Sequence, residues 1–202
     1  MSEPFDEITW PVRTDRLVLR PATPEDAEAI WRYRRLEEVS RWISRAHATL
    51  EDLVRHGFDP DRPRGRIAVE HDGELVGDVV VLVGDGWSQA EVAEQAAGVE
   101  GELGWVFDPR FHGRGLATEA VRELLRLCFE ELGLRRVTAG TFADNEPSWR
   151  LMERVGMRRE SHAVKDSLHR TQGWLDGFEY AMLAEEWPAR GLRPSSGPSP
   201  SG

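Results

Sequence analysis

The chain of 202 residues has a single cysteine, Cys128, and a single lysine, Lys165. One cysteine excludes an intrachain disulfide and a metal cluster built from thiolates. No window approaches the run of about 20 apolar residues that a membrane-spanning helix requires. The opening MSEPFDEITW also lacks the basic and then apolar order of a secretory signal. We therefore expect a soluble, cytoplasmic protein.

Paired histidines and excess positive charge are lacking too. The six histidines include no His-x-x-x-His pair, so the pattern predicts no metal site. The formal net charge of -10 argues against partners such as nucleic acids and membranes, because neutralising phosphates requires a basic surface. Such a charge tolerates a cationic substrate, although keeping the protein soluble is the simpler explanation.

The composition that is present fits one domain. With 40% hydrophobic and 31% charged residues, the chain can fill one core, which we place in residues 1–187. Residues 188–202 are rich in Pro, Ser and Gly and predict a disordered tail. The predicted elements are a strand at 16–20, helices begun by Thr23 and Thr49, a hairpin turning at Asp72-Gly73, a strand at 102–107, a helix at 115–132, a strand at 135–142, a helix at 146–155 and strands at 158–165 and 178–183.

This order predicts a mixed α/β domain with antiparallel strands first and a β-α-β unit at its centre. Residues 85–101 are long for a hairpin loop and carry Trp87 near the tip of the segment. They predict an insertion or a lid.

Gly113 and Gly115 stand between a predicted strand and an amphipathic helix. A helix N-terminus presents unpaired N–H groups and a partial positive charge, so bare backbone there suits a phosphate group. A tight strand-to-helix turn alone explains both glycines equally well. The ATP-binding pattern G-x-x-x-x-G-K-[S/T] is excluded because no lysine follows. The dinucleotide pattern G-x-G-x-x-G is matched in part only, because Thr118 replaces its third glycine, so a dinucleotide-dependent oxidoreductase is a remote alternative.

Three segments together resemble the GNAT superfamily of N-acetyltransferases. They are residues 101–157, the stretch TDRLVLRPATPEDAEAIWRY near the start, and GWLDGFEYAML near the end. The resemblance covers about residues 12–187 and is similar in particular to the branch that acetylates N-termini of ribosomal proteins. It implies a mixed α+β fold whose twisted, mostly antiparallel sheet is splayed in the middle and flanked by helices. It also implies acetyl-CoA as cosubstrate, a primary amine as acceptor and direct transfer in a ternary complex, and it is compatible with a homodimer.

The resemblance places the pyrophosphate of CoA on the turn. The family motif, Gln or Arg, two residues, Gly, one residue, Gly or Ala, falls on His112, Gly115 and Ala117, and His112 departs from it. On the splayed strand, Val106 and Phe107 would offer free N–H groups to the pantetheine arm and the thioester. The residues that the resemblance assigns to the cosubstrate are Val106, Phe107, His112, Gly113, Arg114, Gly115, Leu116, Ala117, Thr118 and Asn145.

Ser148 is the proton donor to the leaving thiolate that the resemblance implies. Many relatives use a tyrosine one turn later, and Met152 stands there in this chain. Helix capping explains Asn145 and Ser148 too, and the two roles do not exclude each other. Cys128 lies on the apolar face of its helix, which argues against an acyl-cysteine intermediate.

The general base stays open. Gly140 stands where some relatives carry a glutamate, which leaves Glu102 and Asp166 as candidates and Asp176 as a less favoured third. Each of them could equally be a solvated surface carboxylate. The absent carboxylate favours a non-catalytic acyl-CoA-binding or regulatory domain, whereas Asn145 and Ser148 favour an enzyme.

Overall fold

The computed structural model describes residues 5, 8–58 and 65–187. An eight-stranded sheet forms the centre of this part of the chain. Its strand order is β1-β2-β3-β4-β5-β6-β8-β7, and neighbouring strands are antiparallel except for β5 and β6. The predicted tail at 188–202 lies outside the described residues. The strands are β1 (Val12–Arg13), β2 (Leu17–Pro21), β3 (Arg66–His71), β4 (Glu74–Gly84), β5 (Glu100–Phe107), β6 (Arg136–Phe142), β7 (Arg158–His169) and β8 (Gly173–Leu183).

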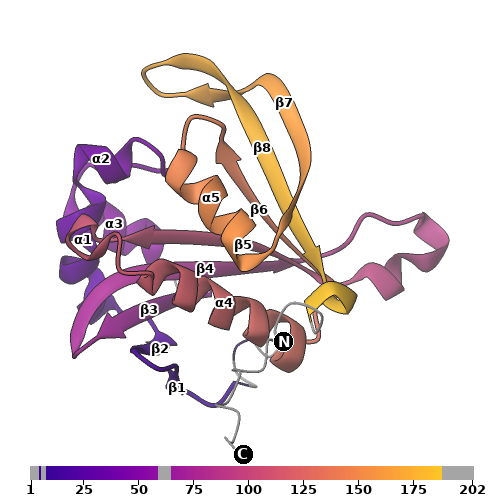
Figure 1. Cartoon of the computed structure of the whole chain (residues 1–202), viewed down its shortest axis with the longest axis horizontal. Coiled ribbons are helices and arrows are strands. Elements are labelled where there is room, and N and C mark those ends of the chain that lie inside the picture. Colours follow the sequence, from indigo (N-terminus) through magenta and orange to yellow (C-terminus); the bar gives the residue numbers. More distant parts are fainter. Residues whose placement is uncertain (1–4, 6–7, 59–64, 188–202) are drawn as a thin grey trace, which may run out of the picture.

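Helices cover both faces of this sheet (Figure 1). One face carries the three helices that precede β3, and the other carries the two helices that follow β5 and β6. The helices are α1 (Ala27–Arg34), α2 (Glu37–Ser40), α3 (Leu50–Gly57), α4 (Leu116–Arg126) and α5 (Glu146–Val155). The mixed fold with antiparallel strands first and a central β5-α4-β6 unit is therefore confirmed.

Local sequence signals explain where several elements begin. The Asp26 carboxylate accepts the Thr23 N–H at 2.8 Å, and a 3₁₀ turn leads from there into α1. The Thr49 hydroxyl accepts the Asp52 N–H at 3.1 Å and caps α3. The β3–β4 hairpin turns at Asp72, which has the positive φ that such a turn requires.

Other boundaries differ from the prediction. The helix predicted over 115–132 ends as α4 at Arg126 and continues as a π-helical turn, Leu127–Glu131. The strands predicted over 158–165 and 178–183 are parts of a longer β7–β8 hairpin. A bulge near Lys165, whose φ is 50°, interrupts the pairing, and mostly polar residues hide the pattern beyond it. Helix α2 was not predicted, because four residues carry too little periodicity.

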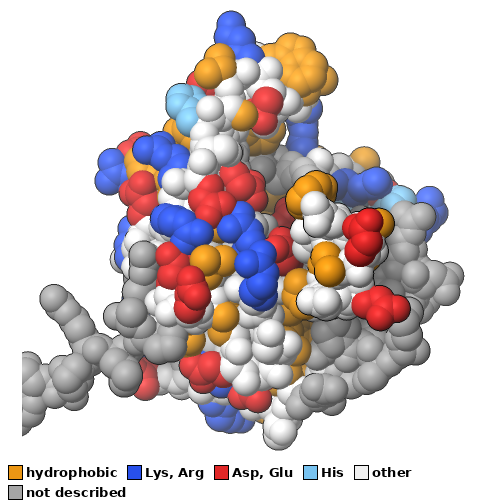
Figure 2. Space-filling view, turned by 90° about the vertical axis from the view of Figure 1, so that its right-hand side faces the viewer, with side chains coloured by type: hydrophobic (Ala, Val, Ile, Leu, Met, Phe, Trp, Pro, Cys, Tyr) orange, Lys and Arg blue, Asp and Glu red, His pale blue; other side chains and the backbone are white. Residues whose placement is uncertain are grey.

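The predicted insertion leaves the sheet between β4 and β5. Its helical pattern forms a 3₁₀ helix, Ala90–Ala96, and Trp87 is 93% exposed. Figure 2 shows acidic and basic side chains interspersed on the face of the molecule beside it. Ion pairs such as Arg135–Glu100 and Arg136–Glu160 agree with that mixture. No helix in the described part of the chain is long and apolar enough to cross a membrane.

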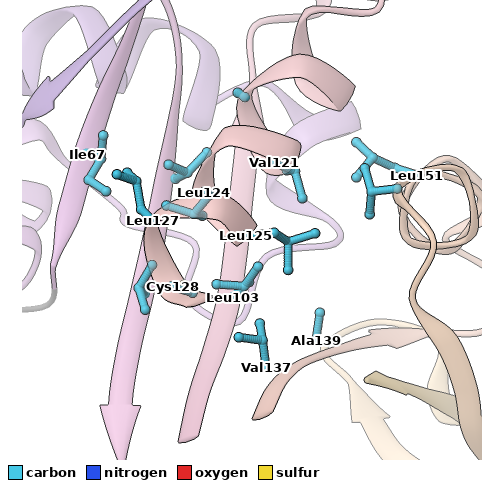
Figure 3. Packing of buried hydrophobic residues seen from close by; sticks show 14 of the residues in the cluster. Ile67, Leu103, Val121, Leu124, Leu125, Leu127, Cys128, Val137, Ala139 and Leu151 are labelled. Carbon is cyan, nitrogen blue, oxygen red and sulfur yellow. The ribbon is translucent and has the colours of Figure 1, made fainter. Parts of the chain in front are cut away.

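The larger core lies between α4 and the sheet (Figure 3). Leu124 and Leu125 of α4 pack there with Leu103 of β5 and Val137 of β6. Cys128 is fully buried among them, and burial raises the pKa of its thiol to about 12. A thiol in this state is no nucleophile at neutral pH, so the packing role predicted for Cys128 fits the structure.

A buried ion cluster ties the other face of the sheet to α1. Asp78 of β4 is fully buried, and its carboxylate pairs with the guanidinium groups of Arg34 and Arg66. The Tyr33 hydroxyl is the third partner and donates a hydrogen bond to it at 2.6 Å. Burial alone would raise the pKa of Asp78, but the two arginines lower it to about 2.

Asp78→Ala should therefore lower the free energy of unfolding by about 3–5 kcal/mol, because two buried guanidinium groups would lose their counter-ion. Because the folded pKa is below the ordinary value, the stabilisation by Asp78 is present above pH 3.8 and is lost as the pH falls toward 2. Chemical unfolding measured between pH 7 and pH 2 checks both statements. The exposed Glu28→Ala on α1 is the control and should change the free energy of unfolding by less than about 0.5 kcal/mol. An unchanged stability of Asp78→Ala would contradict the role of the cluster.

Candidate active site

The sheet opens between its two central parallel strands. β5 and β6 pair only at Glu100–Arg136, Gly101–Val137 and Glu102–Thr138. Beyond these pairs, β5 continues to Phe107 and β6 to Phe142 without further pairing between them. A wedge-shaped gap therefore opens in the middle of the sheet, as the resemblance implied.

The pairing of β4 with β5 decides which N–H groups face this gap. The Asp108 N–H bonds to the Val76 carbonyl at 2.9 Å, and the register is regular from Gly77–Phe107 onward. Because antiparallel hydrogen bonding alternates along a strand, the Val106 N–H is directed at β4, and those of Trp105 and Phe107 are directed at the gap. The free donors are thus Trp105 and Phe107, which corrects the expected N–H role of Val106, although Val106 does line the cleft.

His112 has a backbone partner at the edge of this gap. Its Nε2–H donates to the Phe107 carbonyl at 3.2 Å. A carbonyl on a strand that has lost its neighbour needs such a donor. This hydrogen bond fixes the His112 ring at the edge of the gap and satisfies the Phe107 carbonyl there.

The glycine turn lies at the N-terminus of α4, at one end of the cleft. Gly113 and Gly115 have φ values of 76° and 77°, which a residue with a side chain rarely adopts. No neighbouring atom lies within 4 Å of the Cβ position at Gly113, so the backbone there is open. Gly115 is the N-cap residue and has no side chain to satisfy the first N–H groups of α4, which begins at Leu116. These N–H groups are free to bind an anion.

Arginines from distant segments line the cleft near this turn. The Arg16 guanidinium lies 3.6 Å from the Cβ position of Gly115. Arg154 of α5 bonds to the Thr118 hydroxyl at 3.1 Å, and Arg122 lies on the same wall. Arg16 is paired with Glu119 at 2.6 Å, so Arg122 and Arg154 supply the positive charge beside the free N–H groups, although the chain as a whole is acidic.

Arg110 and Arg114, the two arginines nearest to the glycine turn in sequence, make their contacts with other groups. Arg110 pairs with Asp108 at 2.8 Å and with Glu74 at 2.7 Å. The Arg114 guanidinium lies over the Phe111 ring at 5.3 Å, and Arg114 is absent from the described cleft wall. Arg114 was predicted to bind the cosubstrate, but the structure does not bring it to the described cleft wall.

Asn145 and Ser148 at the start of α5 both line the cleft. The Asn145 side chain makes no capping hydrogen bond, and its backbone carbonyl accepts the Ser148 N–H at 3.1 Å. No hydrogen bond joins the Ser148 hydroxyl to another residue that the structure describes. Capping by these side chains does not account for them, and both remain available to a ligand.

The opposite wall of the cleft is formed by the segment between α2 and α3 and by the β7–β8 hairpin. His169 of the hairpin donates from Nε2 to the Arg41 carbonyl at 2.8 Å. Arg170 donates to the carbonyls of Ser40 and Ile43 at 2.7 and 2.6 Å. The cleft has a volume of about 2040 Å³, which exceeds the roughly 300–1,000 Å³ of a single small-molecule site and leaves room for two substrates.

Several carboxylates line this cleft, and Glu179 is among those that were not predicted. Glu102 and Asp166 are on the wall as expected, and Asp166 accepts the Ser167 hydroxyl at 2.9 Å. Asp176 bonds to His162 at 2.6 Å, which lowers its pKa, and it does not line the described cleft, which fits the structural role favoured for it. Glu179 of β8 lines the cleft, and burial and the nearby Glu102 raise its pKa above the ordinary value.

His47, Asp52 and His56 are the one group of described residues that could hold a metal ion, with ligand atoms within 4.8 Å of one another. Their spacing escaped the search for a His-x-x-x-His pair. His47 Nδ1 lies 3.1 Å and His56 Nδ1 2.9 Å from the Asp52 carboxylate, which also accepts the Ala48 N–H. These contacts give the cluster a structural role, because they hold the segment before α3 against the first turns of that helix.

Known proteins with similar sequences decide the family. The family model described as an acetyltransferase (GNAT) domain matches residues 16–158. The chain belongs to the GNAT acetyltransferase family. It is 29% identical to the uncharacterized N-acetyltransferase YnaD of Bacillus subtilis, over 87% of this chain and 98% of that protein. It is 27% identical to YdaF of the same organism, over 86% of this chain and 94% of that protein. YdaF carries the provisional name of a ribosomal N-acetyltransferase.

A solved GNAT acetyltransferase from Bacillus anthracis has the same architecture. Its TM-score is 0.72 at 31% identity, over 86% of this chain and 98% of that one. Members of the GNAT family are N-acetyltransferases that use acetyl-CoA as cosubstrate. The expected fold and family are both confirmed.

Proposed function

We propose that this GNAT protein transfers the acetyl group of acetyl-CoA to a primary amine, either a protein N-terminus or a small amine, by direct attack in a ternary complex. The observation that carries the proposal is the gap between β5 and β6, which lies in one cleft with the free turn at Gly113 and Gly115 and with several carboxylates. A phosphate end, a thioester site and an acceptor site can thereby lie along one cleft.

In this arrangement the turn and the first residues of α4, from Gly113 to Thr118, hold the pyrophosphate. The free N–H groups of the turn and the arginines Arg122 and Arg154 compensate its charge. The pantetheine arm lies in the gap, where Phe107 and Asn145 offer polar groups to it. The Phe107 N–H also polarises the thioester carbonyl and stabilises the oxyanion that forms in the transition state.

The chemistry needs one acid and one base. The amine attacks the thioester carbon, the carbon–sulfur bond breaks, and the Ser148 hydroxyl gives a proton to the thiolate. A carboxylate on the acceptor side removes a proton from the incoming ammonium group, and Glu102 and Asp166 lie on that wall with Glu179. Direct transfer fits because Cys128, the single cysteine, is buried in the core.

A non-catalytic acyl-CoA-binding domain is the alternative, since Gly140 carries no carboxylate. The carboxylates on the acceptor wall speak against this alternative, because a domain that only binds CoA has no use for them. Thermal unfolding with acetyl-CoA and with NAD separates both from an oxidoreductase: acetyl-CoA should raise the Tm and NAD should not.

The acceptor class is tested by competition. A mixture of peptides with free N-termini, polyamines, amino acids and aminoglycosides is incubated with the protein and acetyl-CoA, and the acetylated products are identified by mass spectrometry. The provisional name of YdaF favours peptides as the preferred acceptors. Acetylation of one class supports the proposal and names the acceptor, and a mixture left unmodified by protein that binds acetyl-CoA contradicts it.

A further inference from the structure

The carboxylate of Glu179 occupies the space above Gly140 on the neighbouring strand. The two residues are direct partners in the β6–β8 pairing. A Cβ built at Gly140 would lie 2.8 Å from Glu179 Oε2, which is closer than atoms in contact allow. The glycine therefore makes room for the side chain of Glu179, which leans across β6.

This position lies where the sheet parts. The last β5–β6 pair is Glu102–Thr138, and Gly140 is two residues further along β6. Asp166 lies farther from this point. Its carboxylate lies beside the Cβ position of Gly177, and Gly177 pairs with Phe142 at the far end of β6. Of Glu102, Asp166 and Glu179, the two beside the start of the gap are thus Glu179 and Glu102.

The alternation of side chains places both on the acceptor side. Leu103 of β5, Ala139 of β6 and Tyr180 of β8 point into the core beneath α4. Their neighbours Glu102, Gly140 and Glu179 accordingly face the opposite side, toward the helices before β3. An amine that entered from that side would meet the Glu179 carboxylate before the thioester in the gap.

We propose that Glu179 is the general base that deprotonates the acceptor amine, an inference that rests on the proposed acetyl transfer. Glu179 takes one proton from the ammonium group, and the freed lone pair forms the nitrogen–carbon bond. The carbonyl electrons move to oxygen and return as the carbon–sulfur bond breaks. The thiolate takes the Ser148 proton, and Ser148 regains one from the nitrogen. The products are the amide, the CoA thiol and a protonated Glu179, which releases its proton to water.

The surroundings of Glu179 suit this task. Burial raises its pKa most, followed by the charge of Glu102, and Thr138 and Arg136 of β6 act in the opposite direction. Glu160 of β7 adds a smaller raising effect. A carboxylate whose pKa is raised is a stronger base than an exposed one with an ordinary pKa.

Glu179→Gln tests the proposal in acetyl transfer to the acceptor that the wild type prefers. At pH 7 we expect kcat to fall about 100-fold or more, while the Kd for CoA changes less than twofold. The pH profile should change as well, because the variant must wait for free amine and its rate should rise tenfold per pH unit up to the pKa of the acceptor. A wild-type rate with a wild-type pH profile in this variant would overturn the proposal.

Stability separates catalysis from a structural role. Because the pKa of Glu179 is raised, its ionised form destabilises the fold at pH values above that pKa. Glu179→Gln should therefore keep or raise the Tm at pH 7, whereas a structural carboxylate would lower it on removal. The matched control is Glu70→Gln, a half-buried strand glutamate away from the described cleft wall, which should leave kcat within about twofold.

Moving the carboxylate to the other strand is the sharpest test. Gly140→Glu combined with Glu179→Gly restores one carboxylate over the same point of β6 and removes the clash. Its kcat should exceed that of Glu179→Gly by tenfold or more, and a folded, CoA-binding double variant without any gain would count against Glu179. If the wild type itself transfers no acetyl group, the proposed function fails. If the wild type is active and Glu179→Gln equals it, only the assignment of the base fails.

Discussion

Gly115→Glu should weaken the binding of CoA at least 100-fold. Gly115 has a φ of 77° and is the N-cap residue of α4, directly where the pyrophosphate is proposed to lie. A glutamate there adds a side chain to a left-handed backbone and places a negative charge where the free N–H groups must meet a phosphate. Titration calorimetry with CoA measures the effect, and the wild type provides the reference.

Backbone strain alone is controlled by Gly133→Glu. Gly133 has a φ of 63°, nothing lies within 4 Å of its Cβ position, and it does not line the described cleft. The same substitution there should cost similar stability but leave CoA affinity within about twofold. Equal losses of affinity in both variants, or an unchanged affinity in Gly115→Glu, would contradict the assignment of the phosphate site.

Ser148→Ala should lower kcat about 100-fold or more and leave the Kd for CoA within about twofold. A general acid contributes roughly 10²- to 10⁴-fold to a rate, and the Ser148 hydroxyl has no other partner among the described residues. Stability should hardly change, because the Ser148 N–H bonds to the Asn145 carbonyl at 3.1 Å and this backbone contact does not need the hydroxyl. Steady-state kinetics of CoA release, together with equilibrium binding, separates the two effects.

Two further substitutions are the controls for that result. Ser148→Thr keeps a hydroxyl and should retain clearly more activity than Ser148→Ala, and Ser88→Ala on the insertion should match the wild type. A Ser148→Ala variant with a wild-type rate would remove Ser148 from the chemistry.

The glycine turn and the start of α5, which both line the cleft, could be predicted from the sequence because each is a short contiguous stretch. Gly113 and Gly115 immediately precede α4, and Asn145 and Ser148 immediately precede or open α5. Helix starts carry strong local signals, and the chemistry of a phosphate site depends on such a start. The choice of Gly115 as a bare cap needed no knowledge of the rest of the fold.

The acceptor half could not be predicted because it depends on pairing between distant strands. Glu179 lies over Gly140 only through the register of β6 and β8, and no local pattern reveals that register. The length of the β7–β8 hairpin was underestimated because the bulge at Lys165 breaks its pattern. The same reason hid Arg16 and Arg154, which come from distant parts of the chain and lie beside the glycine turn and the start of α4.

The one-residue difference between Val106 and Trp105 has a similar origin. A strand's sequence indicates which side chains are buried, but hydrogen bonds to β4 determine which N–H groups remain free at the gap. The resemblance placed the gap correctly, and the pairing fixed its donors as Trp105 and Phe107.

The central claim is that the cleft catalyses acetyl transfer to an amine, and the release of CoA thiol from acetyl-CoA measures it most directly. The assay compares wild-type protein with and without panels of peptides and small amines, with Gly115→Glu as the control in which donor binding is weakened. We expect thiol release that depends on at least one amine, saturates with acetyl-CoA and is strongly reduced in the control. Saturable binding of acetyl-CoA with no amine-dependent release across both panels would contradict it and would favour a domain that only binds acyl-CoA.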